Sequence, residues 1–587
     1  MTDNTKIKLV IDDIVVEASV GQTIMQAADG IGIRIPRLCY HPSLSSLGAC
    51  RICVVHVEGQ RNPVTACTFP VTEGMKVTTS SPLLRKLRRD IVELLLDNHP
   101  KDCQTCERCG HCELQDLAYS LGVRERLYEG ERKHLPRDTS SCAVIRDPEK
   151  CILCGRCVRV CEEVQGVCNL SQQHRGFSNL VAPAHDGDMN ESVCIQCGQC
   201  INVCPTGAFV EQSSTDEVLD ALGNPDLHVV VHTAPSIRAA VGEGFGFPVG
   251  TPVTGKMVTA CRLMGFDQVF DTNFSADLTI VEEATEFLSR FASGKKLPLI
   301  SSCSPGWINF MERFYPELIP LASTCKSPMS MLSTLLKTYY AEKTGIDPAK
   351  IYVVAVMPCT AKKFEARRPE LMAPEGYPYT DAVVTTREFI WLAKCLGVDF
   401  QNLPDGDFDN PLGESSGAGA IFGATGGVME AALRTAYEKL TGETCPDLDF
   451  LEVRGVEGVK EATIDIKGTK INVAVANGLN NAKQVLDAIE SGEKTYHLME
   501  IMACPGGCVA GGGQPYPPAG TYVLDPELTK KRAQALYTID KEKTLRKSHE
   551  NPSIIKLYEE FLGEPNGKKS HELLHTSYRA QEPRGVR

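Results

Sequence analysis

Short runs of alternating apolar and polar residues open the chain. The runs IKLVIDD (7–13) and IVVEAS (14–19) have the period of two that is typical of half-buried strands. TIMQAADGIG (23–32) follows with helical spacing, and RICVVHVEG (51–59) is again strand-like. This order of strand, turn, strand and helix predicts a β-grasp domain at the N-terminus.

The apolar period is longer further along the chain. LLRKLRRDIVELLLD (83–97) has the spacing of an amphipathic helix. From about 225 to 525, apolar runs such as LHVVVHTAP (227–235) and IYVVAVMPC (351–359) alternate with helical stretches, and a polar, helical tail follows. Such alternation predicts an α/β region with a mostly parallel sheet. Its cysteines lie where strands end, which is where open α/β folds place their chemistry.

Composition narrows the class of protein. The 587 residues exceed the roughly 100–200 of one domain. A net charge of -13 argues against a nucleic-acid partner. No apolar run reaches the roughly 18 residues of a membrane span, and residues 1–10 lack the apolar core of a signal peptide. We therefore expect no membrane partner and a cytoplasmic location, where clustered cysteines indicate metal ligands rather than disulfides.

Two four-cysteine runs carry the most specific chemical signal. The second ends in Cys204-Pro205 and has the C-x₂-C-x₂-C-x₃-C-P spacing of bacterial ferredoxins, and the first has the same spacing without the proline. Three thiolates of one loop hold three corners of a [4Fe–4S] cube, and the fourth reaches the neighbouring cube. The predicted ligand sets are Cys151, Cys154, Cys157 with Cys204, and Cys194, Cys197, Cys200 with Cys161. Zinc sites are the alternative, but zinc motifs pair C-x₂-C units across longer gaps.

Two further sets precede these runs. The N-terminal spacing C-x₁₀-C-x₂-C-x₁₃-C, within a β-grasp pattern, predicts a [2Fe–2S] cluster. The next spacing, H-x₃-C-x₂-C-x₅-C, predicts a [4Fe–4S] cluster with one histidine ligand, which should raise its potential. The ligands are Cys39, Cys50, Cys53 and Cys67 in the first set, and His99, Cys103, Cys106 and Cys112 in the second. In the second set Cys109 is a rival fourth ligand, and zinc is an alternative metal.

The order of these four sets, followed by three motifs, resembles the [FeFe] hydrogenases. The motifs are SSCSPGW (301–307), MPCTAKKFE (357–365) and MEIMACPGGCVAGGGQP (499–515). More narrowly, the chain resembles the large subunit of the NAD(P)-linked, multi-subunit forms, some of which bifurcate electrons. The tail is similar to the family's small-subunit segment, and the N-terminal half also resembles the iron–sulfur subunit of respiratory NADH dehydrogenase.

This resemblance implies an H-cluster, which is a cubane linked through one cysteine to a two-iron unit with CO, cyanide and a bridging dithiolate amine. Cys359, Cys504 and Cys508 would be cubane ligands, with Cys508 bridging to the two-iron unit. Independently, Cys504 and Cys508 lie in a Pro/Gly-rich loop, where glycine lets the backbone approach a bulky group. The other implied contacts are Lys362 to a cyanide, Ala234, Pro235 and Ser236 along the dithiolate, and Met357 and Met502 beside the irons. Ordinary core packing is the alternative for the two methionines.

One position departs from the family pattern. The family's first motif has two adjacent cysteines, a proton relay and a cubane ligand, whereas this chain has Cys303 and Ser304. A serine hydroxyl is a weaker acid and a harder donor than a thiol, and is therefore a poorer iron ligand. Cys325 stands where the family usually has alanine, and Met329 where it usually has glutamine. We expect Cys325, in preference to Ser304, to be the fourth cubane ligand.

The resemblance also implies a proton relay. Glu283, Glu286, Ser323 and Cys303 match the family's relay residues. Two glutamates three residues apart on a helix more often lie on a solvent-exposed face. The assignment of Glu283 and Glu286 to a relay therefore depends on the resemblance to the family. Buried carboxylates would cost free energy unless they were paired or functional.

The expected function is hydrogenase activity, 2H⁺ + 2e⁻ ⇌ H₂. Electrons would pass through one [2Fe–2S] and three [4Fe–4S] clusters to the H-cluster. GEGFGFPVG (242–250) lacks the strand–GxGxxG–helix setting of a nucleotide site. The expected partners are a flavin-bearing NADH-dehydrogenase-like subunit, a thioredoxin-like [2Fe–2S] subunit and ferredoxin. The alternatives are a non-catalytic electron relay with an altered H-cluster site, and an H₂ sensor.

We therefore expect an α/β multidomain protein with five parts. In chain order these are a β-grasp [2Fe–2S] ferredoxin domain (1–78), a His/Cys cluster domain (79–120), a two-[4Fe–4S] ferredoxin domain (141–212), an α/β H-cluster domain (225–525) and a helical small-subunit-like tail (526–587).

Overall fold

The computed structural model describes residues 5–125, 128, 130–518 and 520–582, so the outermost residues of the first and last predicted domains lie outside it. The chain forms two compact units. Unit 1 comprises 1–163, 168–192 and 203–210, and unit 2 comprises 164–167, 193–202 and 211–587. Among the described residues, no helix is both long and apolar enough to cross a membrane.

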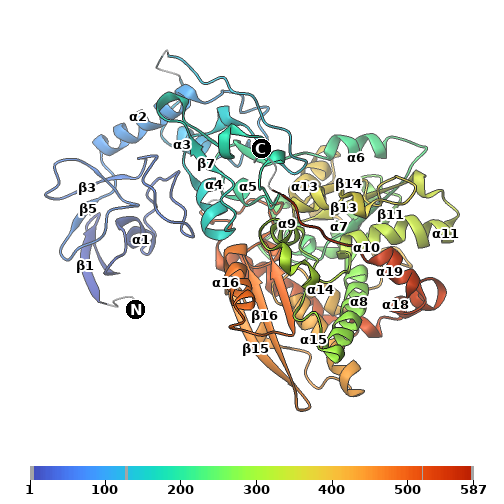
Figure 1. Cartoon of the computed structure of the whole chain (residues 1–587). Helices are drawn as coiled ribbons and strands as arrows, with labels where there is room; N and C mark the ends of the chain where they lie inside the picture. The colour runs from blue at the N-terminus through green and yellow to red at the C-terminus, as the bar shows by residue number, and fades with distance from the viewer. Residues whose placement is uncertain (1–4, 126–127, 129, 519, 583–587) are drawn as a thin grey trace. The chain divides into compact units, whose positions relative to one another are not determined.

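A five-stranded sheet begins unit 1, drawn in blue in Figure 1. Strand β1 (Lys6–Ile11) pairs antiparallel with β2 (Ile14–Ser19) and parallel with β5 (Lys76–Thr78). Strands β3 (Val54–Val57) and β4 (Val64–Thr65) complete the order β2-β1-β5-β3-β4. The predicted β-grasp order is confirmed.

The alternation of residues explains this sheet. Ile7, Leu9 and Ile11 point into the core of unit 1, where they pack with residues of α1 (Ile24–Asp29). Helix α1 begins at Thr23, whose side chain closes a capping box and so satisfies an otherwise unpaired backbone N–H group.

The rest of unit 1 consists of short elements. Helix α2 (Pro82–Asn98) begins after the N-cap Ser81, has proline at its first position, and ends before His99. The remaining helices and strands are α3 (Glu113–Ser120), β6 (Val144–Arg146), α4 (Arg156–Arg159), β7 (Ser171–Gln173), β8 (Leu180–Ala182) and β9 (Phe209–Glu211). The first four-cysteine run begins in the loop before α4, and its third cysteine, Cys157, lies within that helix.

Unit 2 contains two four-stranded sheets. The first is entirely parallel, with the order β11-β10-β13-β14, and the second has the order β12-β17-β16-β15, with only β15 antiparallel to its neighbour. The strands are β10 (His228–Thr233), β11 (Gln268–Asp271), β12 (Leu299–Ile300), β13 (Ile351–Met357), β14 (Ala382–Thr385), β15 (Val459–Ile466), β16 (Thr469–Asn477) and β17 (Leu498–Met502). The sequence pattern predicted one mostly parallel sheet. The strands instead divide between two, because strand periodicity carries no information on which strands pair.

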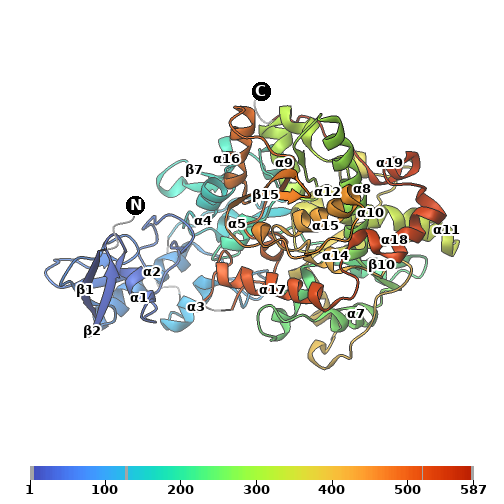
Figure 2. The ribbon, with the colours of Figure 1, turned by 90° about the horizontal axis from the view of Figure 1, so that it is seen from below.

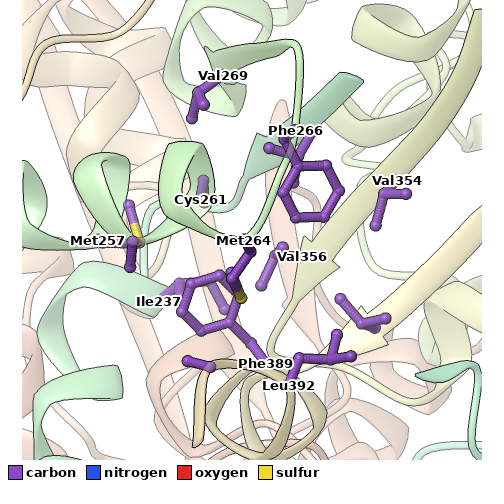
Figure 3. Packing of buried hydrophobic residues seen from close by; sticks show 14 of the residues in the cluster. Ile237, Met257, Cys261, Met264, Phe266, Val269, Val354, Val356, Phe389 and Leu392 are labelled. Carbon is purple, nitrogen blue, oxygen red and sulfur yellow. The ribbon is translucent and has the colours of Figure 1, made fainter. Parts of the chain in front are cut away.

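Helices cover these sheets. Those before the C-terminal segment are α5 (Gln199–Val203), α6 (Thr215–Leu222), α7 (Thr254–Leu263), α8 (Thr272–Ser293), α9 (Pro305–Phe314), α10 (Pro328–Leu335), α11 (Ala341–Thr344), α12 (Ala361–Glu365), α13 (Thr386–Cys395), α14 (Gly417–Ile421), α15 (Gly427–Thr441) and α16 (Leu479–Glu490). Figure 3 shows one apolar interface, where Met257 and Cys261 of α7 and Phe389 of α13 pack near Val354 and Val356 of β13. This packing fixes β13, the strand that leads to Cys359.

The C-terminal segment consists of α17 (Pro526–Glu542), α18 (Pro552–Leu557) and α19 (Lys568–Leu574). Helix α17 lies against α14, and both are visible in Figure 2. A buried ion pair ties α17 to α15: Arg434 donates to Asp540 at 2.9 Å and to Glu430 at 2.6 Å, and all three side chains are fully buried.

We expect Arg434→Leu to lower the free energy of unfolding by about 3–5 kcal/mol, because it leaves two carboxylates buried with fewer partners. Chemical denaturation followed by helical circular dichroism measures this change. Lys530→Leu is the control, since the pair of Lys530 with Glu527 is exposed and should contribute little to stability. Equal effects of the two substitutions would contradict the structural role of Arg434.

Candidate functional site

A cavity in unit 2 lies beyond the carboxyl ends of parallel strands from both sheets. Cys303 and Ser304 follow β12, Cys359 follows β13, and Cys504 and Cys508 follow β17. The cavity encloses about 410 Å³, part of it open to solvent, which is within the roughly 300–1,000 Å³ typical of cofactor pockets. Its polar and sulfur-bearing lining is formed by Cys197, Cys303, Ser304, Cys359, Lys362, Met502, Cys504 and Cys508.

Glycines allow the loops to approach one another closely around this cavity. Gly507 has a φ of +91°, and a Cβ there would lie 2.6 Å from the backbone nitrogen of Thr425. A Cβ on Gly511 would lie 2.2 Å from the carbonyl oxygen of Pro358. Any larger residue at either position would force the loops apart. Gly511 therefore lets the segment after Cys508 lie against the turn that carries Cys359, and Gly507 lets the Cys504–Cys508 loop lie against Thr425.

The thiols are in an environment that disfavours free thiolates. Burial raises the pKa of Cys508 to about 12 and also raises the pKa values of Cys359 and Cys504. The charge of Lys362 acts in the opposite direction on Cys359 and Cys508. Gln199 Nε2 donates a hydrogen bond to Cys504 Sγ at 3.2 Å. Three converging sulfurs that need a compensating positive charge are a donor set suited to iron.

Ser304 and Cys325 occupy different surroundings. Ser304 lines the cavity, and its Oγ accepts a hydrogen bond from the backbone nitrogen of Ala503 at 3.2 Å. Cys325 is fully buried outside the cavity lining, and its backbone forms a β-bridge with His575. Ser302 Oγ also donates to the carbonyl of Cys325 at 2.7 Å. These contacts oppose the chain shift that would bring Cys325 to the cavity, so the geometry favours Ser304, contrary to the expectation from sequence.

Lys362 is held with its ammonium group at the cavity. Its Nζ donates to Glu365 at 2.7 Å and to the carbonyl oxygen of Cys303 at 3.2 Å. This pairing offsets the cost of burying the charge. Lys362 can therefore present a fixed positive charge to an anionic group in the cavity.

The remaining predicted contact residues divide into two groups. Met502 lines the cavity and is 2% exposed. Met357, Ala234, Pro235 and Ser236 are buried but lie outside its lining. Ser236 Oγ is buried without a hydrogen-bond partner within the described structure, so it is available to pair with a bound group.

A chain of proton-bearing groups leads away from Cys303. The charge of Glu283 acts on Cys303, and burial followed by the charge of Glu286 raises the pKa of Glu283 to about 8. Ser323 Oγ donates to Glu286 at 2.8 Å. A carboxyl with such a pKa is protonated at neutral pH and can release its proton there. All four predicted relay residues therefore lie in one connected region.

Sequence reasoning missed two charged neighbours of this chain. Arg290 Nη2 donates to Glu286 at 2.5 Å, and its place one helical turn after Glu286 was a readable signal. Glu500 is 1% exposed and accepts hydrogen bonds from the backbone of Gly426 and Met429 at 2.6 and 2.8 Å. Burial raises the pKa of Glu500 to about 7. Its contacts with a distant loop left no local sequence signal.

The structure gathers the cysteines of one predicted [4Fe–4S] ligand set, but divides those of the other set between the two units. In unit 1 a cavity of about 290 Å³ is lined by all four residues of one predicted set, Cys151, Cys154, Cys157 and Cys204. In the second set, Cys194, Cys197 and Cys200 belong to unit 2, and Cys161 belongs to unit 1. The completion of that set by Cys161 therefore stays a prediction.

The N-terminal set is gathered in unit 1. Side-chain hydrogen bonds link Cys39 with Cys50 and Cys67, and Cys53 with Cys67. The backbone nitrogen of Cys39 also donates to Cys50 Sγ at 3.4 Å. Four sulfurs this close together suit a [2Fe–2S] cluster.

His99 has the surroundings of a metal ligand. It is 8% exposed, and its buried Nδ1 has no hydrogen-bond partner within the described structure. Burial lowers its pKa to about 4, so the imidazole is neutral, which is the form that binds metals. Cys109 is exposed, as is the predicted ligand Cys103, so exposure alone does not separate the rivals.

Family comparisons match successive parts of the chain. Residues 227–512 match the iron only hydrogenase large subunit, C-terminal domain, and 526–581 match the iron hydrogenase small subunit. Before them, 4–82 match a 2Fe-2S iron-sulfur cluster binding domain, 88–126 match the NADH-ubiquinone oxidoreductase-G iron-sulfur binding region, and 150–208 match a 4Fe-4S dicluster domain.

Individual proteins are similar over nearly the whole length. The NADP-reducing hydrogenase subunit HndD of Solidesulfovibrio fructosivorans is 50% identical, over 95% of this chain and 96% of that protein. Iron hydrogenase 1 of Clostridium pasteurianum is 41% identical, over 95% and 97%. A solved structure of a variant of apo [FeFe]-hydrogenase HydA1 from Chlamydomonas reinhardtii is 43% identical, with a TM-score of 0.56, over 63% of this chain and 99% of that one.

If His99 is a cluster ligand, His99→Cys should retain four irons at that site and lower its reduction potential, because a fourth thiolate adds negative charge. A redox titration followed by electron paramagnetic resonance measures the shift. Cys109→Ser is the matched control and should leave the potential in place. The reverse pattern would identify Cys109 as the ligand.

Glu283→Gln should change how stability depends on pH. The folded-state pKa of Glu283, about 8, lies above the unfolded value of about 4.3, so the folded state binds the extra proton between these values. This carboxyl therefore makes the protein less stable as pH rises from about 4 to 8, and glutamine removes that loss. The variant should gain stability relative to the parent between pH 5 and pH 8 in chemical denaturation. A pH-independent difference would contradict the buried, protonated carboxyl.

Proposed function

We propose, since this chain belongs to the [FeFe] hydrogenase family, that the cavity of unit 2 is where it interconverts H₂ with protons and electrons. One observation carries the proposal. The thiols of Cys359, Cys504 and Cys508 converge on one buried cavity, with Cys303 of the proton chain on its wall and Cys197 of a ferredoxin-type loop on the same lining.

The chain carries [2Fe–2S], [4Fe–4S] and H-cluster domains. When bound, the H-cluster supplies the iron at which H₂ is formed or split. Cys359, Cys504, Cys508 and Ser304 would hold its cubane, with Cys508 bridging to the two-iron unit. The placement of Ser304 on the cavity wall supports its oxygen as the fourth ligand, because a bound metal lowers the pKa of a ligand.

Residues of unit 2 would move the protons. Cys303 holds a proton at Sγ on the cavity wall, since burial raises the pKa of its thiol. Glu283 is protonated at neutral pH and would reload Cys303. Ser323 would connect Glu283 with Glu286, whose carboxylate Arg290 fixes at the outer end.

Lys362 would orient an anionic ligand of the two-iron unit, since its Nζ lies at the cavity and is held by Glu365. Met502 lies on the wall and would exclude water from the site. Ala234, Pro235, Ser236 and Met357 would contact the same unit from the adjacent carboxyl ends of β10 and β13. The unpartnered Ser236 hydroxyl supports this role.

Electrons would reach the cavity through the loop of Cys194, Cys197 and Cys200. Cys197 lies on the cavity lining, and Gln199 donates to both Cys504 Sγ and the carbonyl oxygen of Ala510. This loop would hold one of three [4Fe–4S] clusters. The other two, and one [2Fe–2S] cluster, would deliver electrons to it. We propose the same five domains as the sequence predicts, from the [2Fe–2S] domain at 1–78 to the small-subunit-like tail at 526–587.

Electron-transfer partners follow from the relatives. One relative, at 50% identity, is named an NADP-reducing hydrogenase subunit, and the segment GEGFGFPVG (242–250) lacks the setting of a nucleotide site. We propose a flavin-bearing NADH-dehydrogenase-like subunit, a thioredoxin-like [2Fe–2S] subunit and ferredoxin as partners, and a cytoplasmic location.

A second function, an electron relay without H₂ chemistry, is favoured by one observation. The position of Ser304 removes a thiolate from the cavity, which weakens iron binding.

Substitution of Cys303 tests the hydrogenase proposal. Cys303→Ala should retain full iron content and lower H₂ evolution from a reduced viologen dye by roughly 10²–10⁴-fold, as expected when a general acid is lost. Cys395→Ala, at an exposed position of α13, is the matched control and should keep full activity. Full activity of Cys303→Ala would contradict the proton route, and no activity in the parent protein would favour the relay.

A further inference from the structure

Three metal-binding side chains meet outside the ligand sets described above. Glu286 of α8, Cys325 and His575 place one ligand atom each within 4.8 Å of the other two. Cys325 and His575 are 0% and 6% exposed, and Glu286 is partly exposed. A thiol, an imidazole and a carboxylate in one place are a common protein donor set for zinc.

The backbone fixes two of these side chains. Cys325 and His575 face each other across an antiparallel β-bridge. The backbone nitrogen of Lys326 donates to the carbonyl of Leu574 at 2.8 Å, and that of Thr576 donates to the carbonyl of Thr324 at 2.7 Å. The C-terminal segment is therefore attached at this point, and the two ligands do not have to be ordered when a metal binds.

The imidazole of His575 is oriented by its neighbours. Its Nε2 lies 3.1 Å from Glu282 Oε2, and its Nδ1 lies 2.8 Å from Thr324 Oγ1. In the tautomer whose Nε2–H donates to Glu282, Nδ1 is the nitrogen available as a ligand, which is the usual arrangement around bound metals. Thr324 would release Nδ1 by rotating its hydroxyl.

The two carboxylate oxygens of Glu286 have different partners. Oε1 is paired with Arg290, and Oε2 accepts from Ser323 at 2.8 Å and lies 4.0 Å from Cys325 Sγ. The oxygen nearest the thiol is thus the one that takes part in the proposed proton chain.

We propose that Glu286, Cys325 and His575 bind a soft divalent cation of the Zn²⁺ class. Ligands at about 2.0–2.3 Å from a tetrahedral zinc are about 3.3–3.8 Å apart, so the three atoms have to close by about 1 Å. The metal replaces the thiol proton, which leaves to solvent, and the thiolate and carboxylate neutralise its two charges. A water completes the coordination.

This site controls proton flow, an inference that rests on the proposed function of Glu286 as the outer carboxylate of the relay. A cation on Oε2 prevents that oxygen from accepting a proton from Ser323 or from solvent. Zinc is then a reversible inhibitor, bound by a cysteine at the position where the family usually has alanine.

Zinc binding is measured directly on the cluster-loaded protein. After incubation with ZnCl₂ and desalting, the parent should hold about one more zinc per chain than Cys325→Ser or His575→Gln, and Cys395→Ala should match the parent. Zn K-edge X-ray absorption should show one sulfur at about 2.3 Å and nitrogen or oxygen at about 2.0–2.1 Å. The same zinc content and the same sulfur shell in Cys325→Ser would overturn the site, and so would an intact site in His575→Gln.

Inhibition is a separate readout. Zinc should suppress H₂ evolution by the parent, a chelator should restore it, and Cys325→Ser should need at least ten times more zinc for half inhibition of its own activity. Zinc that binds with the predicted sulfur shell but leaves turnover unchanged supports the site and overturns the proton route through Glu286. A parent without H₂ activity that still binds zinc supports the site while the proposed function fails.

Discussion

Buried sulfur at the carboxyl ends of parallel strands is the constraint on which unit 2 depends. Cys359, Cys504 and Cys508 lie in a cavity where burial raises the pKa of each thiol. Three thiolates in such a place are stable only with a compensating cation. Glycines at 507 and 511 bring the loops close enough to share one. Strands β13 and β17 of the two sheets lead to these cysteines and so bring them to one cavity.

The proton chain follows from the same burial. Desolvation holds Glu283 in its protonated form near neutral pH, and Arg290 pairs with the neighbouring Glu286 at the outer end. The C-terminal segment contacts that outer end through His575, which is bridged to Cys325 and lies 3.1 Å from Glu282. A tail that resembles a separate subunit of other hydrogenases is thus part of the surroundings of the relay.

Sequence patterns predicted the local elements well, and they grouped several residues that the structure brings together. Alternation around Ile7 and Leu9 predicted the β-grasp strands, and spacing alone grouped Cys151, Cys154, Cys157 and Cys204, which now line one cavity. The choice between Ser304 and Cys325 was beyond sequence, because it depends on a β-bridge to a residue 250 positions away in the chain. Glu500 was missed for the same reason, since its partners Gly426 and Met429 are remote in sequence. Local spacing predicts loops and ligand sets, and long-range contacts decide which side chain faces a cavity.

Infrared spectroscopy of the matured protein shows whether this cavity holds an H-cluster. Only a two-iron unit gives bands from iron-bound CO and cyanide. These bands should be present in the parent protein and lost in Cys508→Ala. Absence of the bands from parent protein that contains its full complement of ferredoxin-type clusters would contradict the presence of an H-cluster.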